Sequence, residues 1–495
     1  MRTPRPNLLF LFSDQHTQSI AGCYGDVLGV TPNLDRLAQS GVTFDNAYCP
    51  SPLCVPSRMS MLCGRWPYEE TCWTNDDYLR SDAPTWLHAL GAAGIRSVLA
   101  GRLHAMGPDQ LHGYAERTVG DHSPNWGGVP RHDLGVLDKA NDPWRESLER
   151  AGIGQSAYQV KDVETTAAAC DYLRDVARRR QAGDDEPFSL TAGYLLPHPP
   201  YVAWRDDYAR FAGRVPAPRY ADPPMPVHEW EAWWRSNRGI AEVPAEVLMR
   251  ARTAYYALVH RLDAMIGEVL TCLHESGLAE DTLIVYTTDH GDQLGERGLW
   301  WKHTLYEDSI RVPLVVSWPG HLPAGQRRPH VVNLVDVAAT MVDALGGPTL
   351  PHGRGCSLLA VARQPDSVWT DETFIEHCTD VLPAWTGGRA VQQRAVRSDR
   401  WKLIYHHRGA PQLFDLETDP HERNDLAAGA RHVDARDRLT ARVLDGWDPD
   451  GVRARITARR LDKNVLDGWA QNIRPPDEFR WDLRPEHNRL ESVPD

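Results

Sequence analysis

The stretch Asn7-Leu8-Leu9-Phe10-Leu11-Phe12 contains an unbroken apolar run from Leu8 to Phe12, which stops at the polar residues Ser13, Asp14 and Gln15. An apolar run of this length with polar ends is typical of a strand that is buried on both faces, as strands of parallel sheets are. Thr31-Pro32 then opens a helix, with Thr31 as the N-cap and Pro32 in the first turn, and Gly41 ends it. The beginning of the chain therefore predicts a buried strand followed by a helix.

The same alternation continues along the chain. Further strands are predicted at 95–100, 188–196, 282–288 and 312–318, and helices at 83–93, 163–180, 247–275 and 332–345. This βα rhythm predicts the α/β class, with a mostly parallel central sheet covered by helices on both faces. Ligands of such folds bind at the carboxyl ends of the strands. Four residues lie just beyond predicted strand ends, which predicts one shared site: Asp14, Gly101, His198 and Asp289.

The pattern divides the chain into three parts. Residues 1–370 form the predicted catalytic domain. Residues 371–445 form a smaller α+β domain, because 389–405 and 411–416 have the pattern of short antiparallel strands. The segment 446–495 is charged and contains Pro, and no helix or strand is assigned to it. We expect this tail to contact a second subunit of a homo-oligomer, because Trp469 and Trp481 are apolar residues in a polar stretch.

Composition excludes several classes of function. The 495 residues carry a formal charge of −13 without a basic block, which argues against nucleic acid or an anionic membrane as a partner. No stretch approaches the roughly 20 apolar residues that a membrane span needs. The early apolar run is too short for a signal peptide and lacks a cleavage site. Nine scattered cysteines indicate neither a disulfide framework nor a zinc site. We therefore expect a cytoplasmic protein that acts on a small molecule.

The sharpest local pattern is Cys54-Val55-Pro56-Ser57-Arg58. Pro56 suits the first turn of a short helix, which would place the Cys54 side chain at the helix N-terminus. Free N–H groups and the helix dipole favour an anion there and activate a nucleophile. The alternative is a free buried cysteine beside a structural turn, and the local pattern alone leaves both open.

A metal site can be argued separately. Asp14 and Gln15 supply oxygens at one strand end, and Asp289 supplies another with His290 next to it. An oxygen-rich site suits a hard divalent cation such as calcium, or manganese where a nitrogen contributes. The other interpretation of His290 is a strand-end histidine that binds backbone.

Cys-x-Pro-x-Arg resembles the signature of the sulfatase family, in which the cysteine is oxidised to formylglycine after synthesis. Further segments resemble the family in the same order along the chain: 6–15, 31–35, 286–291, 301–313 and 413–426. The resemblance implies an alkaline-phosphatase-like sandwich and a sulfuric ester hydrolase that uses one divalent cation (Ca²⁺ or Mn²⁺). It also implies a maturation enzyme that generates the formylglycine at position 54.

The resemblance also assigns roles to single residues. His104 and His198 look like the catalytic histidines, although a histidine after a strand is more often structural. Lys302 and Arg102 would bind sulfate oxygens, and Asn75, otherwise a plain loop residue, would contact the same sulfate. The family usually has Lys at the position of Arg102. Arg58 would hold the nucleophile, and the implied metal ligands are Asp14, Gln15, the residue made from Cys54, Asp289 and His290.

In the implied mechanism, one hydroxyl of hydrated formylglycine attacks sulfur and His198 protonates the leaving alcohol. His104 then deprotonates the second hydroxyl, and sulfate leaves as the aldehyde returns. The stretches 104–114 and 295–300 resemble choline sulfatases. The 18 Trp residues could form an aromatic box for a quaternary ammonium or simply fill cores and interfaces. Alkyl, aryl and sugar sulfates therefore stay candidates beside choline sulfate.

Two other functions compete. A phosphonate monoester or phosphodiester hydrolase with the same nucleophile is suggested by Gln15, because the family often has a second Asp at this position. A sulfate-ester-binding protein without catalysis would keep Cys54 as a thiol.

Overall fold

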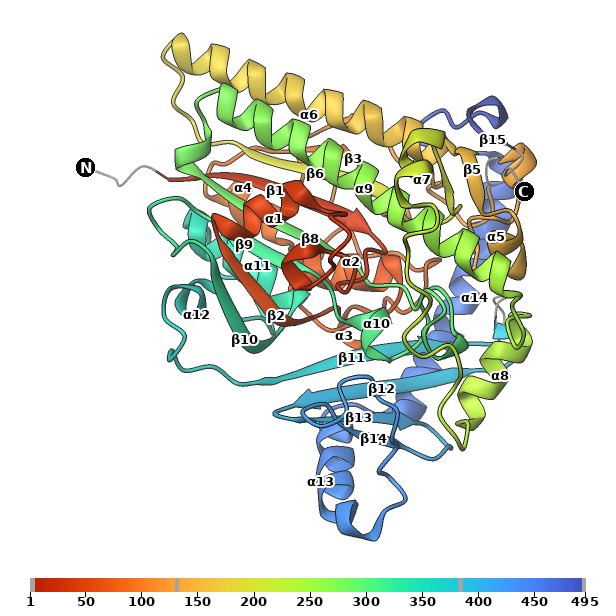
Figure 1. The fold of residues 1–495 in the computed structure, drawn as a ribbon. Helices are drawn as coiled ribbons and strands as arrows, with labels where there is room; N and C mark the ends of the chain where they lie inside the picture. Colours follow the sequence, from red (N-terminus) through yellow and green to blue (C-terminus); the bar gives the residue numbers. More distant parts are fainter. Residues whose placement is uncertain (1–4, 130–132, 382–385, 492–495) are drawn as a thin grey trace.

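The protein is built around one eight-stranded sheet (Figure 1). The computed structural model describes residues 5–129, 133–381 and 386–491. The strand order is β10-β2-β9-β8-β1-β6-β3-β4, and all neighbouring pairs are parallel except the two that β9 makes. The strands are β1 (Asn7–Asp14), β2 (Val42–Tyr48), β3 (Ser97–Gly101), β4 (Glu116–Val119), β6 (Ser189–Pro197), β8 (Thr282–Thr288), β9 (Leu314–Ser317) and β10 (Gln326–Asn333).

Strand β1 lies in the middle of this sheet, between β8 and β6. Leu9 pairs with Ile284 on one side and with Leu190 on the other. Every residue of β1 is buried, as its unbroken apolar sequence predicts. The five predicted strands are present within a few residues of their expected ends, whereas β2, β4 and β10 were not predicted. The predicted α/β class with a mostly parallel sheet is confirmed.

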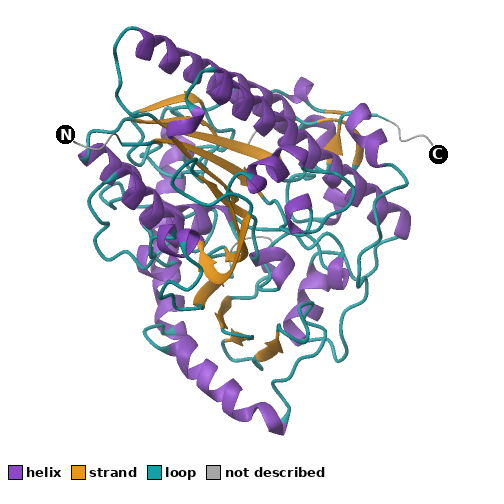
Figure 2. Cartoon of the chain, turned by 60° about the vertical axis from the view of Figure 1, so that its left-hand side comes forward, coloured by secondary structure: helices purple, strands orange, loops and turns teal. Residues whose placement is uncertain are grey.

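Helices cover both faces of the sheet (Figures 1 and 2). Two long helices, α6 and α9, pack against each other and on β6, with α1 and α7 beside α9. On the opposite face, α11 packs on α2 and α4. The bounds are α1 (Pro32–Gln39), α2 (Cys54–Cys63), α4 (Trp86–Ala92), α6 (Ala157–Gln181), α7 (Arg205–Phe211), α9 (Ala245–Glu275) and α11 (Leu334–Leu345).

A second, antiparallel sheet follows the large one and lies below it in Figure 1. Helix α13 (Val433–Leu444) packs on its two middle strands, and a separate hydrophobic cluster forms between them. This is the smaller antiparallel sheet that the sequence predicts, and the strand at 372–379 lies outside the two predicted ranges. Its strands are β11 (Glu372–Thr379), β12 (Val391–Ser398), β13 (Trp401–His406) and β14 (Gln412–Asp415).

The segment after residue 446, which the sequence left unassigned, begins with the long helix α14 (Pro449–Ile473). The chain then returns to the catalytic domain, where β15 (Arg489–Leu490) pairs with β5 (Gly152–Gln155). Trp481 is buried against its own chain and donates from Nε1 to Glu164. Trp469 packs on Trp126 with its ring two-fifths exposed. The homo-oligomer stays a prediction.

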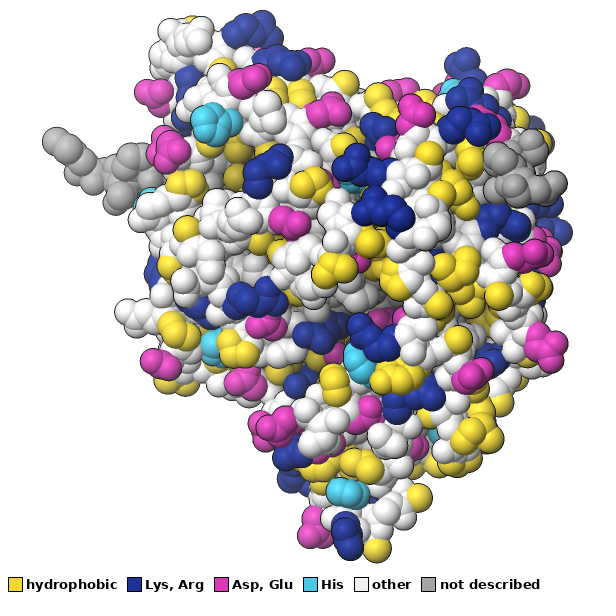
Figure 3. Space-filling model, in the orientation of Figure 1, with side chains coloured by type: hydrophobic (Ala, Val, Ile, Leu, Met, Phe, Trp, Pro, Cys, Tyr) yellow, Lys and Arg dark blue, Asp and Glu magenta, His cyan; other side chains and the backbone are white. Residues whose placement is uncertain are grey.

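Charged side chains of both signs are interspersed on the face shown in Figure 3. Within the ranges given above, no helix combines the length and the apolar content that crossing a membrane requires.

Candidate active site

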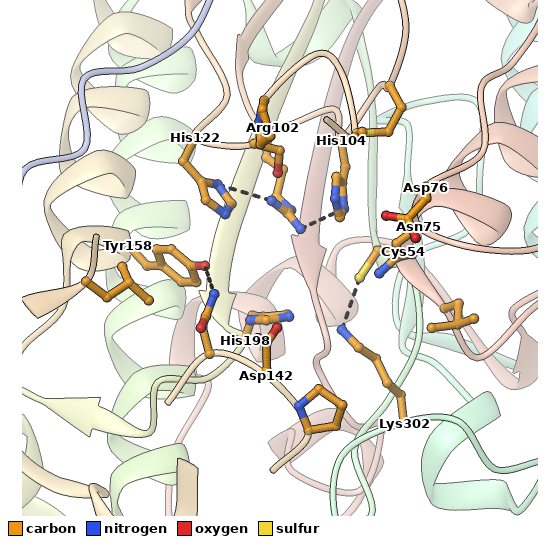
Figure 4. A pocket seen from close by; sticks show the side chains of 18 of the residues that line it. Cys54, Asn75, Asp76, Arg102, His104, His122, Asp142, Tyr158, His198 and Lys302 are labelled. Atoms are coloured by element: carbon orange, nitrogen blue, oxygen red, sulfur yellow. Dashed lines mark hydrogen bonds between the residues drawn. The ribbon is translucent and has the colours of Figure 1, made fainter. Parts of the chain in front are cut away.

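Four neighbouring strands bring the predicted site residues to one edge of the large sheet. Asp14 ends β1 and Asp289 follows β8, while Arg102 follows β3 and His198 follows β6. Since β8, β1, β6 and β3 are consecutive in the sheet, these side chains converge. Arg102 and His198 line a cavity of about 410 Å³ together with Cys54, Asn75, His104 and Lys302 (Figure 4), and Asp14 and Asp289 are buried next to Cys54. The structure thus groups the residues that the sequence had separated by nearly 300 positions.

Cys54 is the first residue of α2 and is fully buried, with Pro56 in the first turn as predicted. Its Sγ lies 3.2 Å from Nε2 of His290 and 3.1 Å from Nζ of Lys302. The N-terminus of α2 is not left free for an anion, because the N–H of Val55 donates to Oδ1 of Asn75 at 3.0 Å. Asn75 therefore holds the start of the helix as well as lining the cavity.

The helix start does not activate the Cys54 thiol in the way the sequence suggested. Burial and the charge of Asp14 raise the pKa of this thiol to about 11, although Lys302 acts in the opposite direction. The N–H groups of one short helix do not offset the loss of solvation at a fully buried sulfur. The thiol is therefore protonated at neutral pH.

The residues around Cys54 can hold a metal ion. One ligand atom from each of Asp14, Cys54, Asp289 and His290 lies within 4.8 Å of all the others, and all four residues are buried. Two carboxylates and an imidazole are a donor set that fits a divalent cation. Gln15 lies beside this group, because its backbone N–H donates to Asp289 Oδ1 at 3.0 Å.

The side chain of Gln15 is held from both ends. Its Oε1 accepts from Nζ of Lys302 at 2.9 Å, and its Nε2 donates to Asp292 Oδ2 at 2.6 Å. Asp292 also accepts from the hydroxyl of Tyr201 at 2.5 Å. Sequence reasoning missed Asp292, although it lies three residues after Asp289 in the same segment and could have been found there.

Buried ion pairs hold the acidic residues in place. Arg58 donates from Nε to Asp289 at 2.8 Å and from Nη2 to Asp14 at 3.0 Å, and Arg102 donates from Nε to Asp14 at 2.6 Å. Burial would raise the pKa of Asp14, but the positive charges, led by Arg102, outweigh it and hold this pKa well below its usual range. The resemblance assigned Arg58 to the nucleophile; its hydrogen bonds here go to the two carboxylates and to the Ser13 carbonyl.

The two candidate catalytic histidines are oriented by different partners. Nη2 of Arg102 donates to Nδ1 of His104 at 2.8 Å, so the neutral His104 ring carries its proton on Nε2. Nδ1 of His198 lies 2.7 Å from the Pro199 carbonyl, to which it donates. Burial holds the pKa of both rings well below the usual value, assisted by Arg102 at His104 and by Lys302 at His198. Both rings are therefore neutral before an anion binds.

Asp121 is a second residue that sequence reasoning missed. Its Oδ2 accepts from the backbone N–H groups of Leu103 and His104 at 3.1 and 2.7 Å, and its Oδ1 lies 3.4 Å from Nη1 of Arg102. It follows β4, which reaches the same sheet edge as the other strands. The unpredicted strand β4 is the signal that would have identified it.

Residues from outside the sheet edge complete the lining of the cavity. Tyr158 from α6 packs on His198 and His122 with Asp142 nearby, whereas Asp76 lies beside Asn75 and Cys54 (Figure 4), and Trp144 lines the cavity as well. Trp144 is the one Trp among the lining residues that the structure describes. Six other Trp side chains are fully buried, as the core-filling interpretation predicts: Trp73, Trp86, Trp234, Trp300, Trp301 and Trp447.

Comparisons with known proteins agree on one family. Residues 6–347 match the sulfatase family model, and residues 295–446 match the model described as N-sulphoglucosamine sulphohydrolase, C-terminal. The chain is 31% identical to a choline-sulfatase of Rhizobium meliloti (strain 1021) over 98% of this chain and 94% of the relative. It is 26% identical to arylsulfatase K of Homo sapiens, over 85% and 79% of the two chains.

The structure resembles solved structures as well. A phosphonate monoester hydrolase of Agrobacterium radiobacter superposes with a TM-score of 0.72 at 23% identity, over 91% of this chain and 96% of that one. This likeness supports the alkaline-phosphatase-like sandwich expected from the sequence. From its fold, its matched family model and its relatives, the chain belongs to the sulfatase family and is a sulfuric ester hydrolase.

Proposed function

We propose that the protein cleaves a small organic sulfate monoester to an alcohol and sulfate, with a formylglycine made from Cys54 as the nucleophile. The observation that carries this proposal is the position of the Cys54 side chain. It lies between His290 and Lys302, at the start of a buried helix and at the floor of the cavity. A group at this position can reach both the proposed metal ligands and a bound sulfate.

A divalent cation, calcium or manganese, would be held by Asp14, Asp289 and His290, with Gln15 and residue 54 completing the set. When bound, it would supply positive charge that lowers the pKa of a neighbouring hydroxyl and offsets charge on the sulfate. The imidazole of His290 among oxygen donors favours manganese over calcium.

The remaining roles fall to the side chains around residue 54. Lys302 and Arg102 bind sulfate oxygens and Asn75 orients the same group, so that the attacking hydroxyl, sulfur and leaving oxygen lie in line. The sulfuryl group passes to the deprotonated hydroxyl oxygen of hydrated residue 54 while the ester S–O bond breaks with its electron pair on the alcohol oxygen. His198, which takes up a proton on Nε2 once the sulfate is bound, gives that proton to the departing alcohol. A bound sulfate anion raises the pKa of His198, because it offsets the charges of Lys302 and Arg102.

The second step releases sulfate. His104 takes the proton of the remaining hydroxyl, the C–O bond to sulfate breaks with its electron pair on sulfate, and the aldehyde re-forms. For this step the His104 ring needs a free lone pair on the nitrogen that faces residue 54. We infer that Arg102 turns from Nδ1 of His104 to the sulfate when substrate binds, which frees the ring to change tautomer.

Cavity size and lining support a small leaving group. A cavity of about 410 Å³ is at the lower end of small-molecule sites. Trp144, Tyr158 and the carboxylate of Asp142 would accept a compact group, including a cationic one. The similarity to a choline-sulfatase supports choline sulfate as one candidate among alkyl, aryl and sugar sulfates.

Phosphonate monoester hydrolysis is the second candidate. Gln15 stands where a second acidic side chain would otherwise add negative charge, and a phosphonate monoester has the tetrahedral shape and single negative charge of a sulfate ester. A panel of aryl sulfate, phosphonate monoester and phosphodiester would separate the two activities. The proposal expects the highest kcat/KM on the sulfate.

The decisive measurement for the nucleophile is the mass of the peptide that spans Ser51 to Arg58. Protein from a host with the maturation enzyme should show the mass of an aldehyde in place of the thiol. Cys63 ends the same helix and is buried too, so its unchanged mass is the internal control. An unmodified Cys54, in a host that matures other sulfatases, would contradict the proposal and favour a sulfate-ester-binding protein.

A further inference from the structure

The segment 475–490, which follows α14, lies outside both matched family models, which end at residues 347 and 446. It nevertheless runs along the edge of the active site. In Figure 1 it returns, in violet-blue, beside β5 and α5 (Arg145–Glu149). Its contacts there link it to the residues that bind sulfate.

The first link is between backbones. The N–H of Asp121 donates to the carbonyl of Phe479 at 2.9 Å, and the N–H of Trp481 donates to the carbonyl of Asp121 at 2.7 Å. Together they form a parallel bridge between Asp121 and Arg480. The two backbones lie so close together that residue 120 must be glycine. A Cβ on Gly120 would lie 1.9 Å from the Phe479 carbonyl oxygen.

The second link is the side chain of Asp121. Its carboxylate is buried and accepts from the N–H groups of Leu103 and His104, with Nη1 of Arg102 at 3.4 Å. Asp121 is therefore joined to the C-terminal segment through its backbone, and to the segment that carries Arg102 and His104 through its carboxylate. Displacing its backbone would displace the carboxylate, and the Arg102 and His104 side chains with it.

The same segment also forms part of the cavity wall. Leu483 is one of the residues that line the cavity. Nε1 of Trp481 donates to Glu164 of α6 at 2.7 Å, and Oδ1 of Asn488 accepts from the N–H of Ala157 at the start of that helix. Tyr158, the next residue, lines the cavity. Besides its contact with Asp121, the C-terminal segment therefore holds the start of α6, which carries Tyr158, through two hydrogen bonds.

We infer that residues 475–490 are a positioning element of the active site, which sets Arg102 and His104 through Asp121 and completes the leaving-group wall with Leu483. None of these residues reacts. The inference rests on the roles proposed above for Arg102 and His104 in binding sulfate and moving a proton.

The first test is Gly120→Ala, which pushes the Phe479 carbonyl away without changing any residue of the cavity. We expect kcat/KM on an aryl sulfate to fall about 100-fold, the cost of a displacement near 1 Å in a catalytic site. Inorganic sulfate should bind on the order of tenfold more weakly, because Arg102 loses its orientation. Gly468→Ala in α14 is the matched control, since its Cβ would meet nothing within 4 Å.

A double-mutant cycle separates positioning from general destabilisation. Asp121→Ala removes the link to Arg102 and His104 from the other side. If the segment acts through Asp121, the double variant should lose no more kcat/KM than the more damaged single variant. Asp121→Asn keeps the shape of the side chain and tests the link should Gly120→Ala not fold: sulfate affinity should fall, together with the melting temperature, because the buried charge beside Arg102 and Arg117 is lost. A folded Asp121→Asn variant with unchanged sulfate affinity would overturn the inference.

The inference is overturned if folded Gly120→Ala keeps its affinity for inorganic sulfate and its kcat/KM, or if the two substitutions have multiplicative effects. Failure of the proposed function is distinguishable from this. A wild-type enzyme that hydrolyses no sulfate ester would refute the function, while sulfate binding to the wild type and the variants would still decide whether the segment positions Arg102.

Discussion

The cavity has two ends that are built in different ways. At the sulfate end, the side chains come from the ends of four adjacent strands, and Asp14, Arg58 and Asp289 are buried and held by ion pairs 2.8 to 3.0 Å long. At the leaving-group end, Trp144 comes from a connection without long regular elements, Tyr158 from a helix start, and Leu483 from the C-terminal segment. The first end is fixed by the sheet, whereas the second is built from a helix start, a connection and the C-terminal segment, which are held by contacts such as those of Asp121 and Trp481.

This difference separates chemistry from selectivity. The acidic residues at the sheet edge are held by ion pairs with arginines. The groups there therefore bind a sulfate in one geometry, whatever alcohol the sulfate carries. Loops and a terminal segment can change without disturbing the sheet, and they are where binding specificity commonly resides. Substitutions at the sulfate end should therefore reduce activity on all esters alike, and those at the other end should change the ranking of esters.

The largest effect is expected at the sulfate end. Arg102→Ala removes a guanidinium that contacts Asp14 and His104, and would bind sulfate. We expect kcat/KM to fall roughly 10²- to 10³-fold on aryl and alkyl sulfates alike, as when one donor to a developing oxyanion is lost. Arg102→Lys, which keeps the charge, should recover part of the loss. Measured ratios between substrates that change tenfold or more would contradict the separation of the two ends.

A smaller and selective effect is expected for Trp144→Ala. Removing the ring enlarges the leaving-group end, so the kcat/KM ratio between two sulfates of different size should change by about tenfold. Inorganic sulfate, which has no leaving group, should bind as before. Trp204→Ala is the matched control, because Trp204 also stacks on an arginine, with Arg261 at 4.6 Å where Trp144 has Arg238 at 4.1 Å, but does not line the cavity.

The sulfate end is also the part of the site that the sequence could predict. Asp14 and Asp289 follow strands that are apolar on both faces, so their place at the sheet edge follows from the parallel arrangement alone. The roles given to His104, His198 and Lys302 came with the family resemblance. Local sequence did not reveal that burial of Cys54 would raise its thiol pKa, because this depends on the packing of three separate segments.

The leaving-group end could not be predicted, for a physical reason. Leu483 reaches the cavity only because residues about 360 positions earlier pair with its neighbours, through contacts such as Asp121 to Trp481. Short two-residue pairings such as β15 with β5 leave no alternation pattern that sequence can show. The partner of Trp481, Glu164, lies 317 positions earlier in α6, so the polar residues around Trp481 give no sign that its ring is buried against this helix.

His122 lies where the two ends meet, and it gives the smallest expected effect. Its Nδ1 is 3.3 Å from Nη1 of Arg102 and 3.2 Å from Asp121, yet the residue lines the cavity next to Tyr158. Burial lowers the pKa of His122 from 6.5 to about 4. The unfolded chain therefore binds a proton more readily than the folded one below pH 6.5. The stability that the neutral ring contributes is complete above pH 6.5 and is lost as the pH falls toward 4.

His122→Gln removes this titration. The free energy of unfolding should depend less on pH in the variant between pH 6.5 and 4, by at most about 1.4 kcal/mol per pH unit. Denaturant titrations at several pH values measure this, with His274→Gln at the exposed end of α9 as the control.

The kcat/KM of His122→Gln then shows to which end of the cavity His122 belongs. An equal loss on all sulfates would place His122 with Arg102 at the sulfate end, whereas a changed ranking would place it in the wall with Tyr158.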